Sequence, residues 1–181
     1  MAIPEANKPK KDLRREMRRL LTTLPGISPQ AVQKLRSWLS EHPELKTISA
    51  YAPLPGEIDL IPLVSEFPQL IWVFPRVEGG NLVLHRVTDP SLDLEPGAFN
   101  IREPQLHLPV IDVFQVDAFF CPGLAFDEYG GRLGRGRGFY DKLLEHARGD
   151  SFKIGICHES QIVPNIFGET HDVTMNEVIY G

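Results

Sequence analysis

The sequence has little cysteine. Cys121 and Cys157, the two cysteines of 181 residues, lie in apolar, strand-like runs, with no C-x-x-C motif and no histidine or cysteine at metal-ligand spacing. We therefore expect two buried free thiols in a reducing compartment. The sequence also has no obvious Ser-His-Asp or Cys-His arrangement, so it gives no indication of a nucleophilic side chain.

Long hydrophobic runs are absent as well. No stretch approaches the ~18 apolar residues that a membrane-spanning helix needs, and residues 1–21 contain no apolar core of signal-peptide length. An arginine-rich start also occurs in organelle transit peptides, but Asp12, Glu16 and the near absence of serine count against that interpretation. We expect a protein of the cytoplasm that does not bind membranes.

Positive charge is scarce outside one segment. The formal net charge is −5, yet residues 8–19 hold seven Lys or Arg against two acids, a local +5 that leaves −10 elsewhere. An acidic body with one basic arm argues against nucleic-acid binding and is suited to a local anion site, although a solvated amphipathic helix would have the same composition. The length predicts one domain, residues 1–181, with residues 1–8 flexible, and we expect a monomer.

Helical periodicity marks two segments near the start of the chain. Apolar residues recur at helical spacing over about residues 9–23, opposite a basic face. A second helix is indicated by Ser28 as N-cap and Pro29 at the first helical position. Both helices are expected to pack on a sheet.

Short apolar runs rich in β-branched or aromatic residues are typical of buried strands. Four such runs occupy residues 47–51, 70–74, 118–121 and 153–157. Helices predicted over 59–67 and 139–147 alternate with them, which predicts an α/β fold, a mostly parallel sheet flanked by helices.

Two further segments complete the predicted fold. Residues 81–87 indicate an antiparallel strand added near an edge of the sheet, and residues 89–115, with four prolines, indicate one long loop. Ligands of such sheets bind beyond the carboxyl ends of the strands. The polar clusters 53–59, 75–76 and 127–138 are expected to converge there.

The most informative segment is 122–146, PGLAFDEYGGRLGRGRGFYDKLLEH, in which five glycines and three arginines within residues 130–138 run into a predicted helix. Glycines allow positive φ and bring N–H groups close to an anion, and the arginines add charge, so we expect a phosphate site. The string fits neither G-x-G-x-x-G nor the Walker pattern. A flexible surface loop with solvated arginines is the alternative.

The string RLGRGRGFYD after PGLAFD resembles the signature of the 5-formyltetrahydrofolate cyclo-ligases, also called methenyltetrahydrofolate synthetases. The resemblance covers nearly the whole chain: a basic K-x-x-L-R, an aromatic strand followed by E-[IV], [FY]-P-R, the glycine signature and a C-terminal H-D-V, in that order. These enzymes have an α/β fold and use ATP and Mg2+ to convert 5-formyltetrahydrofolate into 5,10-methenyltetrahydrofolate. The resemblance implies this reaction and these ligands for the present chain.

The resemblance also implies an ATP site in two segments. The first comprises Lys10, Lys11, Asp12, Leu13 and Arg14. The second comprises Arg132, Leu133, Gly134, Arg135, Gly136, Arg137, Gly138, Phe139 and Tyr140. Lys10, Arg132 and Arg137 carry over as catalytic residues, and the choice between Lys10 and Lys11 as the phosphate contact stays open.

The implied substrate residues overlap the glycine signature. They are Ala52, Glu57, Arg76, Arg135, Gly136, Arg137, Gly138 and Phe139. The Glu57 carboxylate is suited to accept hydrogen bonds from the N–H groups of a pterin, and Arg76 to pair with phosphate or a folate carboxylate. An ordinary loop carboxylate and an exposed arginine are the alternatives for these two.

The implied metal residues are Asp141 and Asn176. Asp141 can bind Mg2+ through its carboxylate, or it can merely complement the helix dipole. The family often has aspartate where this chain has Asn176, which keeps an oxygen ligand but loses the charge, and Asp172 is a candidate to compensate.

Two other functions remain open from the sequence. The departure at Asn176 motivates a catalytically weak relative that binds ATP or folate in a regulatory or storage role. An unrelated sugar-phosphate enzyme on a similar α/β scaffold is the other, since a fold does not fix a function.

Overall fold

The computed structural model describes residues 8–181. Residues 1–7, most of the segment expected to be flexible, lie outside the described residues. Lys8 is described, and the first helix begins there.

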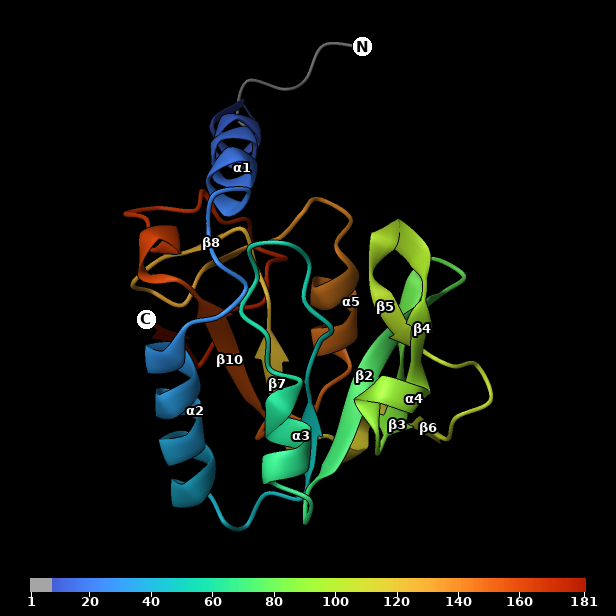
Figure 1. Ribbon diagram of the computed structural model, residues 1–181. Helices are drawn as coiled ribbons and strands as arrows, with labels where there is room; N and C mark the ends of the chain where they lie inside the picture. Colours follow the sequence, from blue (N-terminus) through green and yellow to red (C-terminus); the bar gives the residue numbers. More distant parts are fainter. Residues whose placement is uncertain (1–7) are drawn as a thin grey trace.

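A seven-stranded sheet forms the centre of the molecule (Figure 1). Its strands are β1 (Thr47–Ser49), β2 (Ile71–Glu78), β3 (Asn81–Val87), β6 (Val110–Ile111), β7 (Ala118–Cys121), β10 (Phe152–Cys157) and β11 (Glu177–Tyr180). The strand order is β11-β10-β7-β1-β2-β3-β6, and the first five strands run parallel to one another. Strand β3 pairs antiparallel with β2, and β6 pairs antiparallel with β3. The expected mostly parallel α/β sheet with an antiparallel addition is confirmed.

Helices cover both faces of this sheet. They are α2 (Pro29–Glu41) and α3 (Pro62–Glu66) on one face and α5 (Phe139–Glu145) on the other. Successive side chains of a strand point to opposite faces. Accordingly, Phe120 packs in the cluster with α2 and α3, whereas its neighbour Phe119 packs in the cluster with α5.

Helix α2 begins where its cap residues predict. The Ser28 hydroxyl accepts a hydrogen bond from the Ala31 N–H at 3.2 Å, and Pro29 occupies the first helical position. This cap supplies a partner to an N–H that the first turn leaves free.

Helix α1 (Lys8–Leu21) does not pack on a face of the sheet, contrary to expectation. Its buried residues Met17 and Leu21 contact a cluster with Leu124 and Leu133, at the hairpin formed by β8 (Ala125–Phe126) and β9 (Arg132–Leu133). Figure 1 shows α1 standing above the end of the sheet. A helix with a basic flank and a narrow apolar stripe needs only a small apolar partner, which the hairpin provides.

Strand β2 is longer than predicted, so Pro75 and Arg76 lie within it and not in a loop after it. The Val73 carbonyl accepts from the Ala50 N–H at 2.9 Å, on the side of β1. Two residues later, the Pro75 nitrogen faces the same side, but β1 has ended opposite Val73. The missing N–H of proline therefore costs no hydrogen bond of the sheet.

The prediction of one long loop over residues 89–115 was wrong. The segment contains α4 (Pro90–Asp93), β4 (Leu94–Pro96), the 3-10 turn Ala98–Asn100, β5 (Arg102–Pro104), β6 and the 3-10 turn Val113–Gln115. Strands β4 and β5 pair as a separate two-stranded sheet. Elements of two to four residues carry too little periodicity to be recognised from sequence.

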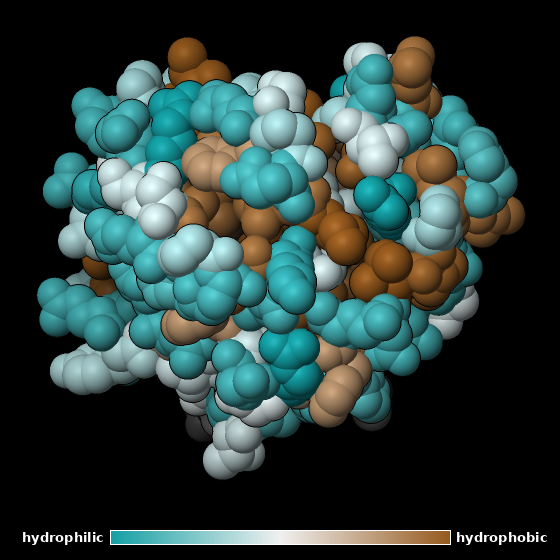
Figure 2. All heavy atoms as spheres, turned by 90° about the horizontal axis from the view of Figure 1, so that it is seen from below, coloured by the Kyte–Doolittle hydropathy of each residue, from teal (hydrophilic) through white to brown (hydrophobic). Residues whose placement is uncertain are grey.

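The end of the molecule opposite α1 has a mixed surface. In Figure 2, which shows the molecule from below, polar residues cover most of this end, and apolar residues show between them, chiefly near the middle and on the side of β3 and β6. Among residues 8–181, no helix has the length and apolar character needed to cross a membrane.

The strand order creates a switch point between β1 and β7. From β1, the chain adds β2 on one side, while β7, β10 and β11 extend the sheet on the other side. The connections on the two sides of such a point diverge, and this leaves a crevice beyond the carboxyl ends of the strands. The loops that follow β1 and β7 therefore border a common space, above which α1 stands.

Gly56 allows the loop after β1 to approach α1. Its φ is +83°, and a Cβ added there would overlap the Leu21 carbonyl group. We expect Gly56→Ala to lower the free energy of unfolding by roughly 3 kcal/mol, because it adds a steric clash to a left-handed backbone. Urea denaturation measures this loss.

Gly80 provides a matched control for this substitution. It has the same φ of +83°, but an added Cβ meets nothing within 4 Å. Gly80→Ala should cost only the backbone strain, roughly 1 kcal/mol. Equal losses in the two variants would show that contact with α1 contributes nothing.

Candidate active site

A cavity of about 880 Å³ opens above the carboxyl ends of β1 and β7. Its walls come from α1, the loop after β1, β2, the 98–103 segment, the glycine-rich loop 134–138, and residues 169–172. The predicted site residues that line it are Lys10, Lys11, Arg14, Ala52, Glu57, Arg132, Gly134, Arg135, Gly136, Arg137, Gly138, Phe139, Tyr140 and Asp141. Segments more than 120 positions apart in the sequence thus share one cavity.

The basic face of α1 is bonded to the glycine-rich loop. Arg14 Nε donates to the Gly134 carbonyl at 3.1 Å, and Arg18 Nη2 donates to the Arg135 carbonyl at 2.8 Å. Both arginines also line the cavity. The contacts fix the loop by its carbonyl groups and place two guanidinium groups beside its N–H groups.

Lys10 is the buried lysine of this face, 4% exposed. Its ammonium donates to Asp172 Oδ2 at 2.6 Å, and the same oxygen accepts from the Glu169 N–H at 2.8 Å. Burial alone would raise the pKa of Asp172, but these hydrogen bonds and the Lys10 charge hold that pKa below its ordinary value. Asp172 therefore anchors Lys10 at the edge of the cavity as an ion pair.

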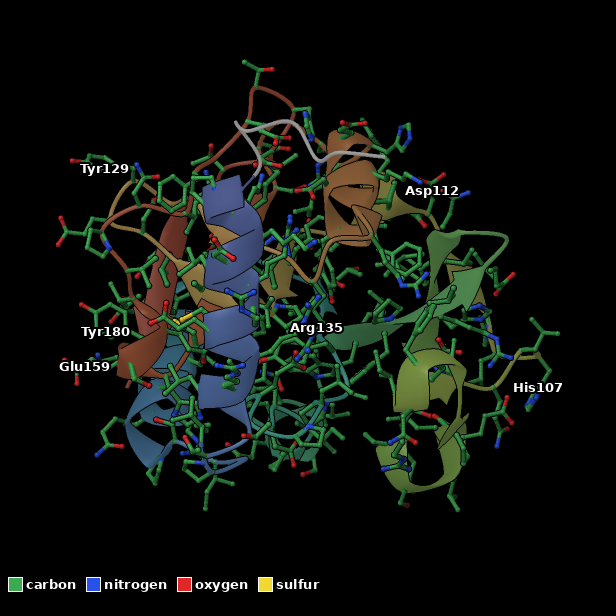
Figure 3. The ribbon with its side chains drawn as sticks, turned by 90° about the horizontal axis from the view of Figure 1, so that it is seen from above. His107, Asp112, Tyr129, Arg135, Glu159 and Tyr180 are labelled. Atoms are coloured by element: carbon green, nitrogen blue, oxygen red, sulfur yellow. The ribbon has the colours of Figure 1, made fainter. Side chains whose placement is uncertain are left out.

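A buried ion pair joins the loops that follow β1 and β7. Arg135 donates through Nη2 at 2.7 Å and through Nε at 3.3 Å to Glu57 Oε1, and Glu57 Oε2 accepts from the Leu54 N–H at 2.9 Å. Glu57 is 7% exposed, whereas the Arg135 side chain is 37% exposed. Figure 3, seen from above, shows Arg135 near the centre of the molecule beside α1.

Arg132 and Asp141 form a second ion pair, deeper in the cavity. Arg132 Nη2 donates to Asp141 Oδ1 and Nη1 to the Pro122 carbonyl, both at 3.2 Å. The guanidinium carbon lies 5.3 Å from the centre of the Tyr140 ring, a cation–π contact. Burial raises the pKa of Tyr140 well above its ordinary value, so this ring stays neutral.

The glycines of the loop have two different roles. Gly130, Gly136 and Gly138 have positive φ, as expected. Gly131 and Gly134 do not, and the corresponding prediction was wrong: a Cβ at Gly131 would collide with the Asp127 carboxylate at 2.6 Å, and one at Gly134 would press on the Arg132 guanidinium at 3.2 Å. These two glycines provide space for neighbouring side chains.

Arg137 reaches across the cavity to the 98–103 segment. Its guanidinium carbon lies 4.0 Å from the centre of the Phe99 ring, and this ring lies 6.0 Å from that of Phe139. Arg137 thus faces the cavity opposite α1, within a partly aromatic wall.

Five predicted residues do not line the cavity. Arg76 donates through Nη1 to Glu95 at 3.0 Å and to the Pro104 carbonyl at 2.7 Å. Asn176 accepts through Oδ1 from the Lys153 N–H at 2.7 Å, at the edge between β10 and β11. The others are Asp12, paired with Arg15 on the surface, and Leu13 and Leu133, which pack in the apolar contact under α1. The structure does not bring any of the five to the site.

Sequence reasoning missed several lining residues. Arg18 lies one helical turn after Arg14, so periodicity could have found it. Tyr51 lies two residues after the end of β1, where the rule of the carboxyl ends applies. For Glu103, which is 4% exposed and accepts from the Val77 N–H at 3.1 Å, no local signal existed, because only the β4–β5 pairing brings it there.

The oxygen ligands that Mg2+ prefers are available at Asp141, whose carboxylate lines the cavity and uses one oxygen for Arg132. Residues Glu169, His171 and Asp172 also hold possible ligand atoms within 4.8 Å of one another. A positive group lies beside each candidate, the Lys10 ammonium 2.6 Å from Asp172 and Arg132 Nη2 3.2 Å from Asp141.

Both cysteines are buried and free, as the sequence predicted. Burial raises the pKa of each thiol to about 12, so neither is a thiolate near neutral pH. Neither residue lines the cavity.

Comparison with known proteins decides the family. A sequence model of the 5-formyltetrahydrofolate cyclo-ligase family matches residues 6–181. The chain belongs to this family. Proteins named 5-formyltetrahydrofolate cyclo-ligase are 29% identical over 190 residues in Haemophilus influenzae, covering 95% of this chain and 97% of that one, and 32% identical over 164 residues in Mycolicibacterium smegmatis, covering 83% and 84%.

Solved structures agree with this membership. The NMR structure of Aquifex aeolicus 5,10-methenyltetrahydrofolate synthetase has a TM-score of 0.82 and 32% identity, covering 94% of this chain and 89% of that one. The synthetase from Mycoplasma pneumoniae, at 23% identity, a TM-score of 0.77 and coverage of 94% and 97%, has the same fold. The cyclo-ligase fold thus extends over nearly the whole present chain.

The ion pair of Asp172 with Lys10 predicts a pH-dependent stability. In the folded protein the pKa of Asp172 is lowered from its ordinary value of 3.8. The contribution of the ionised carboxylate to the free energy of unfolding is therefore complete above pH 3.8, and it is lost as the pH falls through the lowered pKa of the folded state. We expect Asp172→Asn to cost about 1–2 kcal/mol at pH 7 and progressively less below pH ~4. Urea denaturation between pH 3 and 7 measures the difference.

Asp12→Asn is the control. Asp12 lies on α1, the helix that carries Lys10, but it pairs with Arg15 on the surface. Exposed pairs contribute little to stability, so this variant should match the wild type throughout. If the loss of unfolding free energy in Asp172→Asn stayed constant down to pH 3, it would not come from the ion pair of Asp172 with Lys10.

Proposed function

We propose that this chain catalyses the conversion of 5-formyltetrahydrofolate into 5,10-methenyltetrahydrofolate with ATP and Mg2+, releasing ADP and phosphate. The observation that carries the proposal is the meeting of α1, the glycine-rich loop and the buried Glu57 in one cavity of a cyclo-ligase family member. Such a ligase serves one-carbon metabolism. We further propose that it acts as a cytoplasmic monomer and accepts polyglutamylated substrate.

The reaction requires an oxygen atom to leave from an amide. The formyl oxygen of N5 attacks the γ-phosphorus of ATP, and ADP departs. N10 then attacks the formyl carbon of this iminophosphate, the carbon–oxygen bond breaks as phosphate leaves, and N10 loses its proton. No step needs a nucleophilic side chain, which agrees with the buried, protonated thiols.

Phosphoryl transfer of this kind depends on positioning and on neutralisation of charge. Positive groups surround the space above the glycines: Lys10, Arg14 and Arg18 come from α1, Arg132 comes from β9, and Arg137 comes from the loop. We assign the triphosphate to this end of the cavity, with Lys10, Arg132 and Arg137 as the catalytic groups. Because Lys10 is buried and Lys11 is exposed, Lys10 is the better phosphate contact.

The pterin is assigned to the other end, where Ala52, Leu54 and Val77 provide apolar walls around Glu57. Glu57 accepts three hydrogen bonds from Arg135 and Leu54, which leaves capacity for an N–H of the ligand. The Arg135 side chain, more exposed than Glu57, also lines the cavity, so it can meet phosphate or the folate without leaving Glu57.

Magnesium would be held by the Asp141 carboxylate, where it neutralises charge on the transferring phosphoryl group when bound. Arg132 orients that carboxylate from 3.2 Å. Asn176 lies outside the cavity, so its amide no longer gives a reason to prefer a catalytically weak binding module.

Near-ultraviolet absorbance tests this function. Purified protein mixed with 5-formyltetrahydrofolate should develop the methenyl band only when Mg2+ and ATP are both present. A flat trace from folded protein that still binds ATP or folate would contradict the assignment and favour a binding role.

The metal assignment separates two substitutions. We expect Asp141→Asn to raise the Mg2+ concentration for half-maximal turnover by about tenfold or more, since a charged ligand becomes neutral. Asn176→Asp should leave that concentration unchanged, because this side chain bonds the backbone of β10. A Mg2+ titration of turnover measures both, and a shift in Asn176→Asp alone would reverse the assignment.

A further inference from the structure

Tyr51 has a buried hydroxyl that no described protein group satisfies. The residue is 3% exposed, lines the cavity two residues after the end of β1, and its Oη has no hydrogen-bond partner among the described residues. Arg132 Nε is the other buried side-chain atom of this kind within residues 8–181, and it belongs to the same cavity. The unmet polar groups thus gather at the site.

A buried hydroxyl without a partner destabilises the protein that carries it. Phenylalanine would fill the same space without that penalty. Tyrosine at this position therefore serves a purpose other than packing, and a partner from a bound ligand would satisfy it. Its place at the cavity wall is where such a partner can reach it.

The neighbourhood of Tyr51 limits what that partner can be. Burial, and after it the charge of Glu57, raise the pKa of Tyr51 well above its ordinary value, so the phenol stays protonated and can donate. Glu57, an acceptor, lines the same cavity. The cavity wall thus offers a ligand one donor and one acceptor.

One edge of a pterin has the complementary pattern, because the N3–H donor and the C4 carbonyl acceptor are adjacent in the ring. We propose that Tyr51 determines specificity by donating its hydroxyl proton to the 4-oxo group while Glu57 accepts from N3–H. This rests on the proposed function, which assigns the pterin to Glu57. The pair would favour 4-oxo ligands over 4-amino analogues, in which a donor replaces the acceptor.

A matched ligand pair tests this role. Dissociation constants are measured for 5-formyltetrahydrofolate and for its 4-amino-4-deoxy counterpart, on wild type and Tyr51→Phe. We expect the variant to bind the 4-oxo ligand about five- to tenfold more weakly, as for one lost hydrogen bond, and the 4-amino ligand as tightly as before. KM for 5-formyltetrahydrofolate should rise by the same factor, with kcat and KM for ATP unchanged.

Thermal unfolding without ligand distinguishes this role from a packing role, because loss of a packing role would lower the melting temperature. Removal of an unsatisfied hydroxyl should leave the melting temperature of Tyr51→Phe equal to or above that of the wild type. Tyr129→Phe is the matched control, because Tyr129 is 81% exposed and lies at the periphery in Figure 3. It should change neither affinity nor melting temperature.

Other outcomes would overturn the inference. Equal weakening of both ligands would indicate lost packing, no weakening would place the hydroxyl away from the ring, and a lower melting temperature would mean that the hydroxyl already has a structural partner. Wild-type protein without methenyl formation would instead refute the proposed function. Turnover by the wild type with an unchanged variant would refute only the role of Tyr51.

Discussion

The ion pair between Glu57 and Arg135 is the constraint on which the site depends. Glu57 follows β1 and Arg135 follows β7, so the pair closes the switch point of the sheet from both sides. A carboxylate as buried as Glu57 is expensive without a partner, and the Leu54 N–H alone does not neutralise its charge. The two loops are therefore held together by the cost of separating these groups.

Helix α1 depends on the loop that this pair holds in place. A small apolar cluster under Met17 and Leu21 and the close approach of Gly56 to the Leu21 carbonyl attach the helix to the body. Its basic residues add Arg14 and Arg18 on loop carbonyls and Lys10 on Asp172. The same basic side chains fasten the helix and line the cavity. Attachment of α1 and assembly of the basic wall of the cavity thus depend on the same contacts.

The sequence predicted those elements whose formation depends on residues close to them in the chain. The strand at 118–121 and the start of α2 at Pro29 follow from an apolar run and from the Ser28 cap, so both were predicted correctly. Strands β4 and β5 pair with each other but are too short to show a period, and β11 depends on its pairing with the more distant β10, so all three were missed. At the site, most residues of the glycine signature line the cavity, as expected. The resemblance alone could not show that Arg76 bonds Glu95 or that Asn176 bonds the backbone of β10, because side-chain direction is set by the neighbours of each strand.

In the proposed reaction, two parts of the cavity wall would solve different parts of one chemical problem. A phosphorylated formyl group is an intermediate that water can destroy, so charge neutralisation without exclusion of water would waste ATP. In this proposal the arginines and Lys10 meet the first need, and the aromatic and apolar wall that includes Phe99, Phe139 and Tyr140 meets the second. Arg137 belongs to both groups, because it carries charge and its guanidinium carbon lies 4.0 Å from the centre of the Phe99 ring.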